Sequence, residues 1–414
     1  MSGTVRVLIP FWTGVPAHCF YQEFQRGIGE AVRELGHEPV PFQFGTKCGS
    51  TEAEANGYFQ LLQRVRIGVV LDLACWGCAF SGIWVPHEGP GRVPICDRFD
   101  VACVGWLFDH LHSQFIHRIH ASRLYAAYPD LGQPEQARLI YPNLKTAGDI
   151  VAPPAVRAAA DTSMEDWSKG RDIDVLYVGN LVPGALGRFW HDRSSSLWSH
   201  SQDPTFCDAL AEAVLQEPET PLHVAMQKTI EKLGITPLGL HAQFSAVEHF
   251  LRFTVRRDAV VAVARSGVRM QVVGKGWDGI ALPPNVEMRP EINYSEFFRL
   301  AGQAKICLDA STYVDGANDR VFTYAVNRAV CFTNSAGYLR ATFGDDGGMR
   351  FYSTANLPGL CEGIRTLLSR RRLLCELGES AKQTVLSAHT WRHRLERILA
   401  AAAAPATATS SATP

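Results

Sequence analysis

Three loops in the second half of the 414-residue sequence combine glycine with charged or aromatic side chains. They are residues 179–188 (GNLVPGALGR), 274–278 (GKGWD) and 315–320 (DGANDR). Glycine lets the backbone approach an anion closely, and a nearby basic side chain neutralises that anion. Each loop alone is equally well explained as an ordinary turn between a strand and a helix. Together, the three loops indicate a site for a phosphate-bearing ligand such as a nucleotide.

Each loop offers groups that suit such a ligand. In the second loop, Lys275 supplies a compact positive charge and Trp277 an aromatic face for a base or a sugar. In the third loop, Asn318 or Asp319 can cap the helix that follows, and the free backbone N–H groups there would join Arg320 in attracting a diphosphate. The remaining candidates, from the glycine-rich turns, are Gly179, Asn180, Arg188 and Gly274.

Alternating strands and helices must position these loops. Continuous apolar runs typical of buried strands alternate along the chain with segments of helical periodicity. This pattern predicts an α/β fold with parallel sheets, in which ligands bind outside the carboxyl ends of the strands. The expected strands are residues 5–10, 38–44, 67–73, 101–108, 173–178, 268–273, 306–308 and 330–333. The expected helices are residues 21–35, 58–65, 206–215, 248–264, 294–301, 320–326, 357–368 and 371–385.

The composition excludes several kinds of partner. Lys and Arg total 40 and Asp and Glu total 41, and this balance favours neither nucleic acid nor an anionic membrane surface. The 11 cysteines lie mostly in apolar stretches, which is typical of a reducing cytoplasm. The sequence shows no signal peptide and no run of about 20 apolar residues, so we expect a cytoplasmic protein without a membrane span.

Two clusters have the residue types of a metal site but not its spacing. Cys75 and Cys78 form a CxxC pair, yet no second pair follows at the distance of a zinc site. Four histidines lie between residues 110 and 120, but only His117 and His120 share a helical face, and no carboxylate lies at the matching turn. We therefore expect no metal site.

Composition also divides the chain into domains. Pro, Ala and charged residues predominate between residues 150 and 170, and the alternation then restarts. We expect one Rossmann-like domain over residues 1–165 and another over residues 171–388. A terminal helix over residues 389–402 and a disordered tail over residues 403–414, rich in Ala, Thr, Ser and Pro, complete the chain.

Several of these segments, in this order, resemble the CgeB-like glycosyltransferases of the spore-maturation type. The resemblance covers most of residues 100–400, and its motifs are moderately specific. The similar segments are residues 106–110 (WLFDH), 174–180 (DVLYVGN), 272–277 (VVGKGW), 318–333 (NDRVFTYAVNRAVCFT), 357–368 and 389–398 (HTWRHRLERI).

The resemblance implies the GT-B fold, in which two Rossmann-like domains face each other across a cleft. The second domain would bind a UDP-, GDP- or dTDP-linked sugar, and the first an acceptor, which could be a glycan, a protein or a small molecule. No cofactor or metal is implied. Arg320 takes the position beside the donor phosphates, Gly179 and Gly274 take the strand-end turns, and the terminal helix would cross back to the first domain. Thr323 departs from the family, which commonly has an acidic residue there to bind the ribose hydroxyls.

An inverting transfer also needs a base that deprotonates the acceptor. Three residues of the first domain lie beyond the ends of expected strands, on the side of the cleft: His18, Asp109 and His110. A histidine in such a loop is also often a surface or structural residue, and this interpretation stays open for His18.

Two other functions on the same fold stay open. A nucleotide-sugar epimerase or hydrolase would turn over the donor without an acceptor. A catalytically silent module would only bind a partner, and Thr323 in place of an acid favours that possibility. A dinucleotide-dependent oxidoreductase is less well supported, because no G-x-G-x-x-G follows the strand at residues 5–10.

Overall fold

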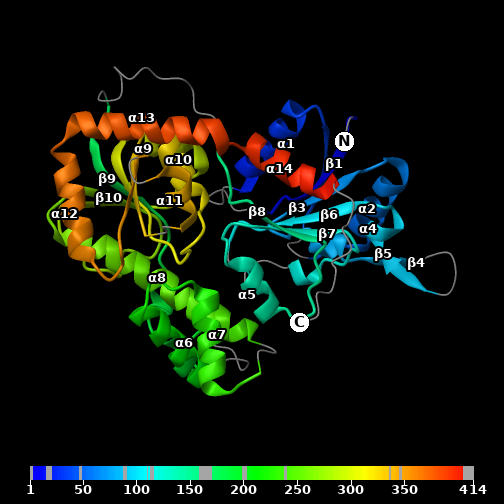
Figure 1. Ribbon diagram of the computed structural model, residues 1–414, viewed down its shortest axis with the longest axis horizontal. Helices are drawn as coiled ribbons and strands as arrows, with labels where there is room; N and C mark the ends of the chain where they lie inside the picture. The colour runs from blue at the N-terminus through cyan, green and yellow to red at the C-terminus, as the bar shows by residue number, and fades with distance from the viewer. Residues whose placement is uncertain are drawn as a thin grey trace.

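The predicted α/β fold with two Rossmann-like domains is confirmed by a computed structural model, in which each domain contains a six-stranded parallel sheet (Figure 1). The strand orders are β2-β1-β3-β6-β7-β8 and β11-β10-β9-β12-β13-β14. The structure describes residues 3–14, 21–45, 49–86, 91–109, 111, 116–157, 170–197, 203–236, 240–334, 337–344 and 347–403.

The central strands of the first sheet are buried on both faces, which explains their continuous apolar sequences. The strands are β1 (Arg6–Trp12), β2 (Glu38–Phe44), β3 (Val69–Leu73), β6 (Ala102–Trp106), β7 (Leu124–Tyr128) and β8 (Gly148–Val151), and β4 (Trp84–Pro86) pairs with β5 (Arg92–Pro94) outside the sheet. The helices are α1 (Tyr21–Glu34), α2 (Glu52–Arg64), α3 (Cys78–Ser81), α4 (Ile95–Arg98) and α5 (Gln133–Ile140).

In the second sheet, β9 lies between β10 and β12, so the sheet has its topological switch point beside β9. The strands are β9 (Ile173–Val178), β10 (Met270–Val273), β11 (Val286–Arg289), β12 (Ala304–Leu308), β13 (Val330–Thr333) and β14 (Met349–Phe351). The helices are α6 (Pro204–Gln216), α7 (Leu222–Leu233), α8 (His241–Arg265), α9 (Tyr294–Gln303), α10 (Asp319–Val326), α11 (Gly337–Phe343), α12 (Leu357–Leu368), α13 (Arg371–Ala388) and α14 (Trp391–Ala403).

The sequence did not predict strands β4, β5, β7, β8, β11 and β14 or helices α3, α4, α5, α7 and α11. These strands have only three to five residues each, and the edge strand β11 (VEMR) has no buried residue. A short edge strand lacks the apolar run that identifies a buried one. Helix α7 begins after Pro221 with no side-chain cap, so its start also lacks a signal in the sequence.

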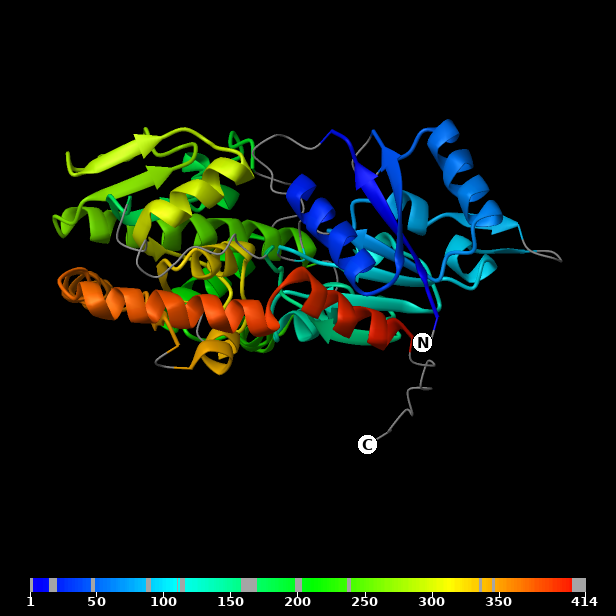
Figure 2. The same ribbon diagram turned by 90° about the horizontal axis from the view of Figure 1, so that it is seen from above.

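The last helix packs on the first domain although it follows the second one in the chain. Figures 1 and 2 show α13 running along the second domain and α14 continuing onto the first, beside α1. The Trp391 ring lies 5.1 Å from that of Phe24 and 5.6 Å from that of Trp106. A Cβ atom on Gly27 of α1 would lie 2.5 Å from the Trp391 ring, so only glycine permits this approach. The hydrophobic core of the first domain therefore includes the C-terminal helix α14.

A short backbone bridge joins the domains directly. The Ala317 N–H donates to the Pro129 carbonyl at 3.1 Å, and the Leu131 N–H donates to the Asp315 carbonyl at 3.2 Å. The buried carboxylate of Asp130 also accepts from the Asp315 N–H at 3.1 Å. Burial raises the pKa of Asp130 to about 6, and the nearby Asp315 adds to this shift. The loop after β7 thus holds the loop after β12, which lies at the carboxyl edge of the second sheet.

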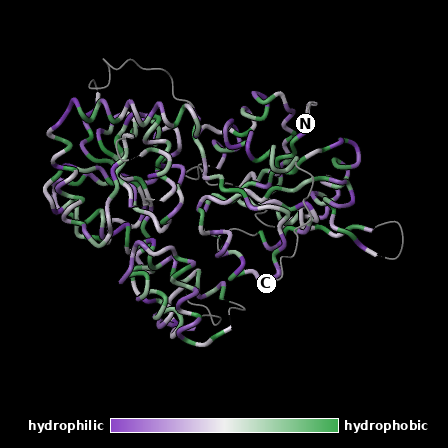
Figure 3. Tube along the Cα trace, in the orientation of Figure 1, coloured by the Kyte–Doolittle hydropathy of each residue, from purple (hydrophilic) through white to green (hydrophobic). Residues whose placement is uncertain are grey.

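The hydropathy of the helices follows their position on the surface. In Figure 3, hydrophilic and hydrophobic segments alternate along the helices, as expected where one face packs on a core and the other meets water. Among the helices within the described ranges, none has the length and apolar character needed to cross a bilayer.

Candidate functional site

Four of the predicted residues meet at the carboxyl edge of the second sheet: Gly179, Asn180, Gly274 and Arg320. They line a pocket of ≈ 160 Å³ beside the switch point. The other lining residues are Val178, Val273, Glu291 and Ile292, so the pocket is built from the ends of β9, β10 and β11 and from α10. This is the position at which open parallel sheets bind their ligands.

The floor of this pocket depends on two glycines in contact. Gly274 has a φ of +139°, which L side chains rarely adopt, and a Cβ atom there would lie 2.5 Å from the Gly179 carbonyl oxygen. The Gly179 N–H donates to the Val273 carbonyl at 2.9 Å, which ties the ends of β9 and β10 together. The backbone is thus exposed to a ligand at a point where a side chain would cover it.

Gly274→Ala is expected to weaken binding of the predicted nucleotide ligand about tenfold. Forcing a side chain into this conformation costs about 1–3 kcal/mol, and the methyl group pushes the Gly179 loop out of place. Isothermal titration calorimetry of the variant and the wild type with UDP measures the effect. Gly279→Ala, a glycine in the same loop with open space around it, is the control and should leave the affinity unchanged.

Asn180 and Lys275 are held by one acidic residue. The Asn180 side chain accepts from the Lys275 N–H at 3.0 Å and donates to Glu291 at 2.6 Å. The Lys275 ammonium group pairs with the same Glu291 carboxylate. Lys275 therefore contributes a neutralised pair at the rim of the pocket rather than the isolated charge that the sequence suggested.

Trp277 differs from its predicted role. Its ring is only 2% exposed and lies against Tyr177 at 5.5 Å, so it presents no face to a base or a sugar. Its indole N–H donates to the Gly179 carbonyl at 2.8 Å. Trp277 thus positions the glycine turn from behind.

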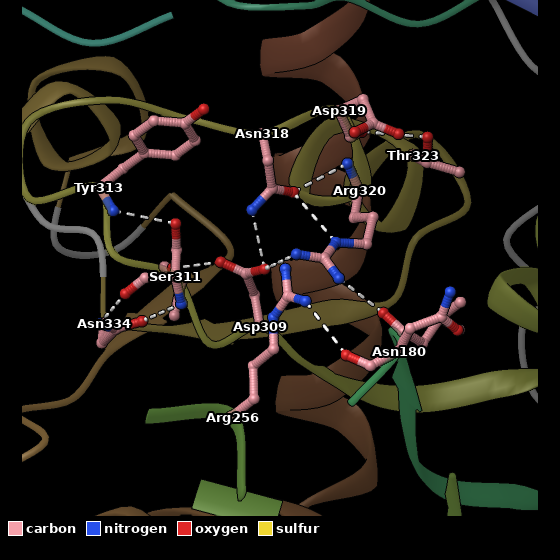
Figure 4. A network of polar contacts seen from close by, with 12 residues as sticks. Asn180, Arg256, Asp309, Ser311, Tyr313, Asn318, Asp319, Arg320, Thr323 and Asn334 are labelled. Carbon is pink, nitrogen blue, oxygen red and sulfur yellow. Dashed lines mark hydrogen bonds and ion pairs between the residues drawn. The ribbon is translucent and has the colours of Figure 1, made fainter. Parts of the chain in front are cut away.

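Arg320 lies at the centre of a buried polar network around Asp309 (Figure 4). Its guanidinium donates to the Val178 carbonyl at 2.7 Å and lies 3.5 Å from the Asp309 carboxylate. Asn318 caps α10 by accepting from the Arg320 N–H at 3.0 Å and donates to Asp309 at 2.9 Å. Burial opposes the charge on Arg320, but the neighbouring acidic and tyrosine groups, Asp309 foremost, together outweigh it and keep the pKa raised. The cation is thus fixed at the end of β9.

A second guanidinium, that of Arg256 on α8, lies beside Arg320 (Figure 4), and the sequence analysis did not identify it. It donates to the Asn180 carbonyl at 3.1 Å, two residues beyond the carbonyl that Arg320 holds. Its Nε atom is buried and has no hydrogen-bond partner in the part of the chain that the structure describes. Burial, and then the positive charges of Arg320 and Arg252, lower the pKa of Arg256. Two repelling cations beside a glycine turn favour an anion between them.

The spacing along α8 gave a signal for this arginine. Glu248, Arg252 and Arg256 recur every four residues and so share one face of a long helix that is otherwise largely apolar. Charged residues at this spacing inside an apolar helix indicate a polar surface within the fold. The sequence alone did not show that this surface faces the loop after β9.

Comparison with known proteins agrees with this geometry. Residues 256–400 match a family model described as glycosyl transferase-like. Among solved structures, the chain resembles an α-glucosyltransferase (AGT) in complex with UDP, with 11% identity and a TM-score of 0.52 over 97% of this chain and 100% of that one. It also resembles Alr3699/HepE of Anabaena in complex with UDP and glucose, with 11% identity and a TM-score of 0.52 over 96% and 99% of the chains.

A third similar structure is AviGT4, a glycosyltransferase involved in avilamycin A biosynthesis, with 13% identity and a TM-score of 0.50 over 96% and 97% of the chains. None of the curated proteins compared matches the sequence significantly. The chain has the fold of the GT-B glycosyltransferases. The pocket at the carboxyl end of β9 therefore lies in the part of the chain that corresponds in fold to the second domain of those structures.

In this GT-B chain, Asp319 and Thr323 lie one turn apart on α10 beside Arg320 (Figure 4). Thr323 donates to the Asp319 carbonyl at 3.1 Å, and its hydroxyl lies 3.5 Å from that of Tyr294. The Oδ2 atom of Asp319 is buried and finds no hydrogen-bond partner within the described ranges. Burial raises the pKa of Asp319 to about 6, although Arg320 opposes that shift. An acid is thus present on this helix, four residues before the position where the family resemblance implies one.

Arg188 does not join this site. It pairs with Asp208 at 2.8 Å and with Glu212 at 3.3 Å, both on α6. Its charge is used to fasten the loop after β9 to that helix. The sequence placed it near phosphate because it closes a glycine-rich loop, but the loop turns away.

Asp109 lies at the contact between the domains. Its carboxylate accepts two hydrogen bonds from Arg252 of α8, at 2.8 and 3.2 Å, and Arg252 also pairs with the buried Glu248 at 2.7 Å. Asp109 thus connects the end of β6 to the helix that carries Arg256. His18 and His110 lie outside the described residues.

The two clusters considered for metal binding show other arrangements. Cys75 and Cys78 are buried free thiols in the turn after β3, where Cys75 has a φ of 52°. His117 stacks on Tyr141 at 4.5 Å, and burial lowers its pKa to about 4. Within the described residues, no group of three or more His, Cys, Asp and Glu side chains is arranged to hold a metal ion.

Proposed function

We propose that this GT-B chain transfers a sugar from a nucleoside-diphosphate donor to an acceptor bound between the domains, in the manner of the CgeB-like glycosyltransferases. Residues 171–388 would bind the donor, and residues 1–165, with the crossing helix over 389–402, would bind the acceptor. UDP-, GDP- and dTDP-linked sugars are the donor classes. We propose a cytoplasmic location, which the nine described free cysteines support.

The observation that carries this proposal is the pair of guanidiniums at the end of β9. Arg320 and Arg256 hold the Val178 and Asn180 carbonyls on either side of Gly179. An isolated buried charge costs free energy unless an opposite charge compensates it, and Asp309 compensates only Arg320. A diphosphate beside Gly179 would compensate both arginines and accept from the buried Nε of Arg256. Fixed cations in this place would stabilise the departing nucleoside diphosphate without a metal.

The nucleoside would occupy the remainder of the ≈ 160 Å³ pocket at the end of β9. Its wall contains Ile292 and the amide-bearing Asn180, which suit the flat apolar face and the polar edge of a base. We propose that the Oδ2 atom of Asp319, which has no hydrogen-bond partner among the described residues, binds the ribose hydroxyls together with the Thr323 hydroxyl. Asp319 would then supply the carboxylate that residue 323 lacks, which weakens the argument for a silent module.

Donor binding is expected to depend on the protonation of Asp319. With a pKa of about 6, this carboxyl is charged above that pH, and hydrogen bonds from ribose hydroxyls favour the charged form. The affinity for UDP-glucose should therefore be full above about pH 6 and fall below it, by up to about tenfold per pH unit. UDP-glucose is the ligand because its diphosphate has no proton to gain in this range. Asp319→Asn should show weaker binding and no such dependence.

On the acceptor side, we propose that Asp109, His18 or His110 provides the base. Asp109 is placed at the domain contact, but Arg252 engages both of its oxygens. When substrates bind, Asp109 would have to give up hydrogen bonds from Arg252 in order to accept one from the acceptor hydroxyl. The two histidines stay candidates beside it.

Thermal unfolding of the purified protein with UDP, GDP and dTDP tests the proposal. A ligand that binds only the folded state, at ~100 times its dissociation constant, adds about 2.7 kcal/mol to the stability. A shift with one of the three identifies the base, and no shift with any of them would sink the donor-binding proposal. The corresponding nucleotide sugar is then incubated with and without candidate acceptors, in EDTA. Turnover without an acceptor would instead indicate an epimerase or a hydrolase.

A further inference from the structure

The chain passes between the two domains at two places that lie side by side. In the first passage, residues 152–157, Ala155 packs in the core of the first domain and the next residue, Val156, in that of the second. In the second passage, residues 388–391, α13 ends on the second domain and α14 begins on the first (Figures 1 and 2). Val156 and Thr390 join the passages by a parallel β-bridge. A rotation of one domain against the other must therefore bend the chain here.

One buried side chain, that of Arg394, bonds to both passages. Arg394 lies one turn into α14 and is 1% exposed. Its Nε–H group donates to the Pro153 carbonyl of the first passage at 2.9 Å. Its other nitrogens donate to the Ala388 carbonyl at 3.4 Å and to Nδ1 of His389 at 2.7 Å, both in the second passage. A guanidinium presents its donors in a rigid fork, so these bonds fix the two passages relative to each other.

Dipoles rather than an acid compensate this buried cation. Burial lowers the pKa of Arg394, and Tyr338 opposes that shift; no carboxylate of the described residues pairs with the guanidinium. The Ala388 carbonyl ends α13, where the helix dipole favours a cation. Burial also lowers the pKa of His389 to about 3, so its ring is neutral and can accept. A buried cation without a charged partner costs free energy, so the geometry that Arg394 imposes explains it better than a gain in stability.

The same guanidinium contacts the helix that carries Arg320. It lies over the Phe322 ring of α10, 5.5 Å from its centroid. The His389 ring stacks on Phe322 at 5.4 Å, with an angle of 13° between the ring planes. Phe322 follows Arg320 by two residues in α10. The helix beside the donor pocket is therefore packed directly on the two passages.

We propose that Arg394 is a positioning residue that fixes the orientation of the first domain relative to α10. It does not line the donor pocket, so it acts through the chain passages and Phe322. Its consequence for catalysis rests on the proposed function: if α10 binds the donor and the first domain the acceptor, Arg394 aligns the two. A misplacement of about 1 Å can slow a transfer roughly 100-fold. The orientation itself can be tested without any ligand.

Single-molecule fluorescence resonance energy transfer measures this orientation. An azide-bearing amino acid in place of Asn56 on α2 and of Arg372 on α13 carries the two dyes and leaves the native cysteines unmodified. Both residues are exposed, and Figure 1 places α2 and the start of α13 at opposite ends of the molecule. The wild-type protein should give one narrow distance distribution. Arg394→Met removes the bonds and keeps an apolar stem, and should widen the distribution about twofold or more, because bending at the passages is no longer restrained.

Three comparisons separate positioning from a loss of folding. Arg397→Met, at an exposed arginine further along α14, should keep the wild-type distribution. Arg394→Lys keeps the charge without the fork that reaches both passages, so it should widen the distribution as Arg394→Met does. Thermal unfolding establishes that each variant is folded. Both Arg394 variants should bind UDP within about threefold of the wild type, because Asp309 and Asn318 still hold Arg320.

A folded Arg394 variant that keeps the wild-type distribution would overturn this inference. So would a folded variant whose UDP affinity falls more than about tenfold, because Arg394 would then act on the donor pocket itself. If UDP does not bind the wild-type protein, the donor-binding proposal fails, while the width of the distribution without ligand still decides whether Arg394 orients the domains.

Discussion

Arg256→Met is expected to weaken UDP binding roughly 30- to 150-fold, which corresponds to the loss of about 2 to 3 kcal/mol for hydrogen bonds to a charged group. The same change should leave the unliganded protein at least as stable as the wild type. It removes a buried cation whose Nε atom has no described partner and which Arg320 repels. Methionine retains the length and the apolar stem of the side chain. A gain in stability together with a loss of affinity is the expected signature of a ligand-binding charge.

The matched control is Arg257→Met, one residue further along α8. Arg257 pairs with Asp258 at 2.7 Å and does not contact the Gly179 loop, so its removal should leave UDP affinity unchanged. Thermal unfolding gives the stability and calorimetry gives the affinity. If Arg256→Met and Arg257→Met bind UDP equally well, the diphosphate does not lie at Arg256.

Trp391→Ala is expected to destabilise the first domain by about 3–5 kcal/mol, the usual cost of truncating a buried aromatic residue. For a domain of this size, the melting temperature would fall by roughly 6–20 °C. Trp391 is 3% exposed and contacts Phe24 and Trp106, which lie far from it in the sequence. Its removal thus separates the last helix from α1.

Trp84→Ala is the matched control, because Trp84 is 45% exposed on β4 of the same domain. Its loss should change the melting temperature little. Limited proteolysis locates the damage: in Trp391→Ala, the first cleavages should fall within the first domain. Equal melting temperatures for the two variants would show that α14 does not complete that core.

Burial on both sides made β3 and β6 predictable, but not β7 (Leu124–Tyr128), which is also wholly buried and was missed. Strands β3 and β6 consist wholly of buried residues, so their apolar runs identified them directly. Strand β11 lies at a sheet edge and alternates polar with apolar residues, so no run marked it. The glycines at the ends of β9 and β10 were recognisable because the sequence keeps glycine where a side chain would meet its neighbours, and Gly274 also has a φ that favours glycine.

Roles that depend on packing between distant elements could not be predicted. Trp277 follows a glycine turn, as a ligand-binding aromatic would, but its N–H is bound to the Gly179 carbonyl behind the pocket. Arg188 lies in a glycine-rich loop, but α6 supplies acids that pair with it. Arg256 lies in the middle of a helix, and only the position of α8 against the loop after β9 reveals its contact with Asn180.

During synthesis, the first domain leaves the ribosome long before the helix that completes its core. Trp391 follows the end of β8 at Val151 by 240 positions (391 − 151). At 5–20 residues per second, this interval lasts about 12–48 s. Throughout it, the face of α1 that Trp391 later covers is exposed, with Phe24 and Ile28 on it. The first domain therefore cannot reach its final state until α14 has been synthesised, long after its own sheet.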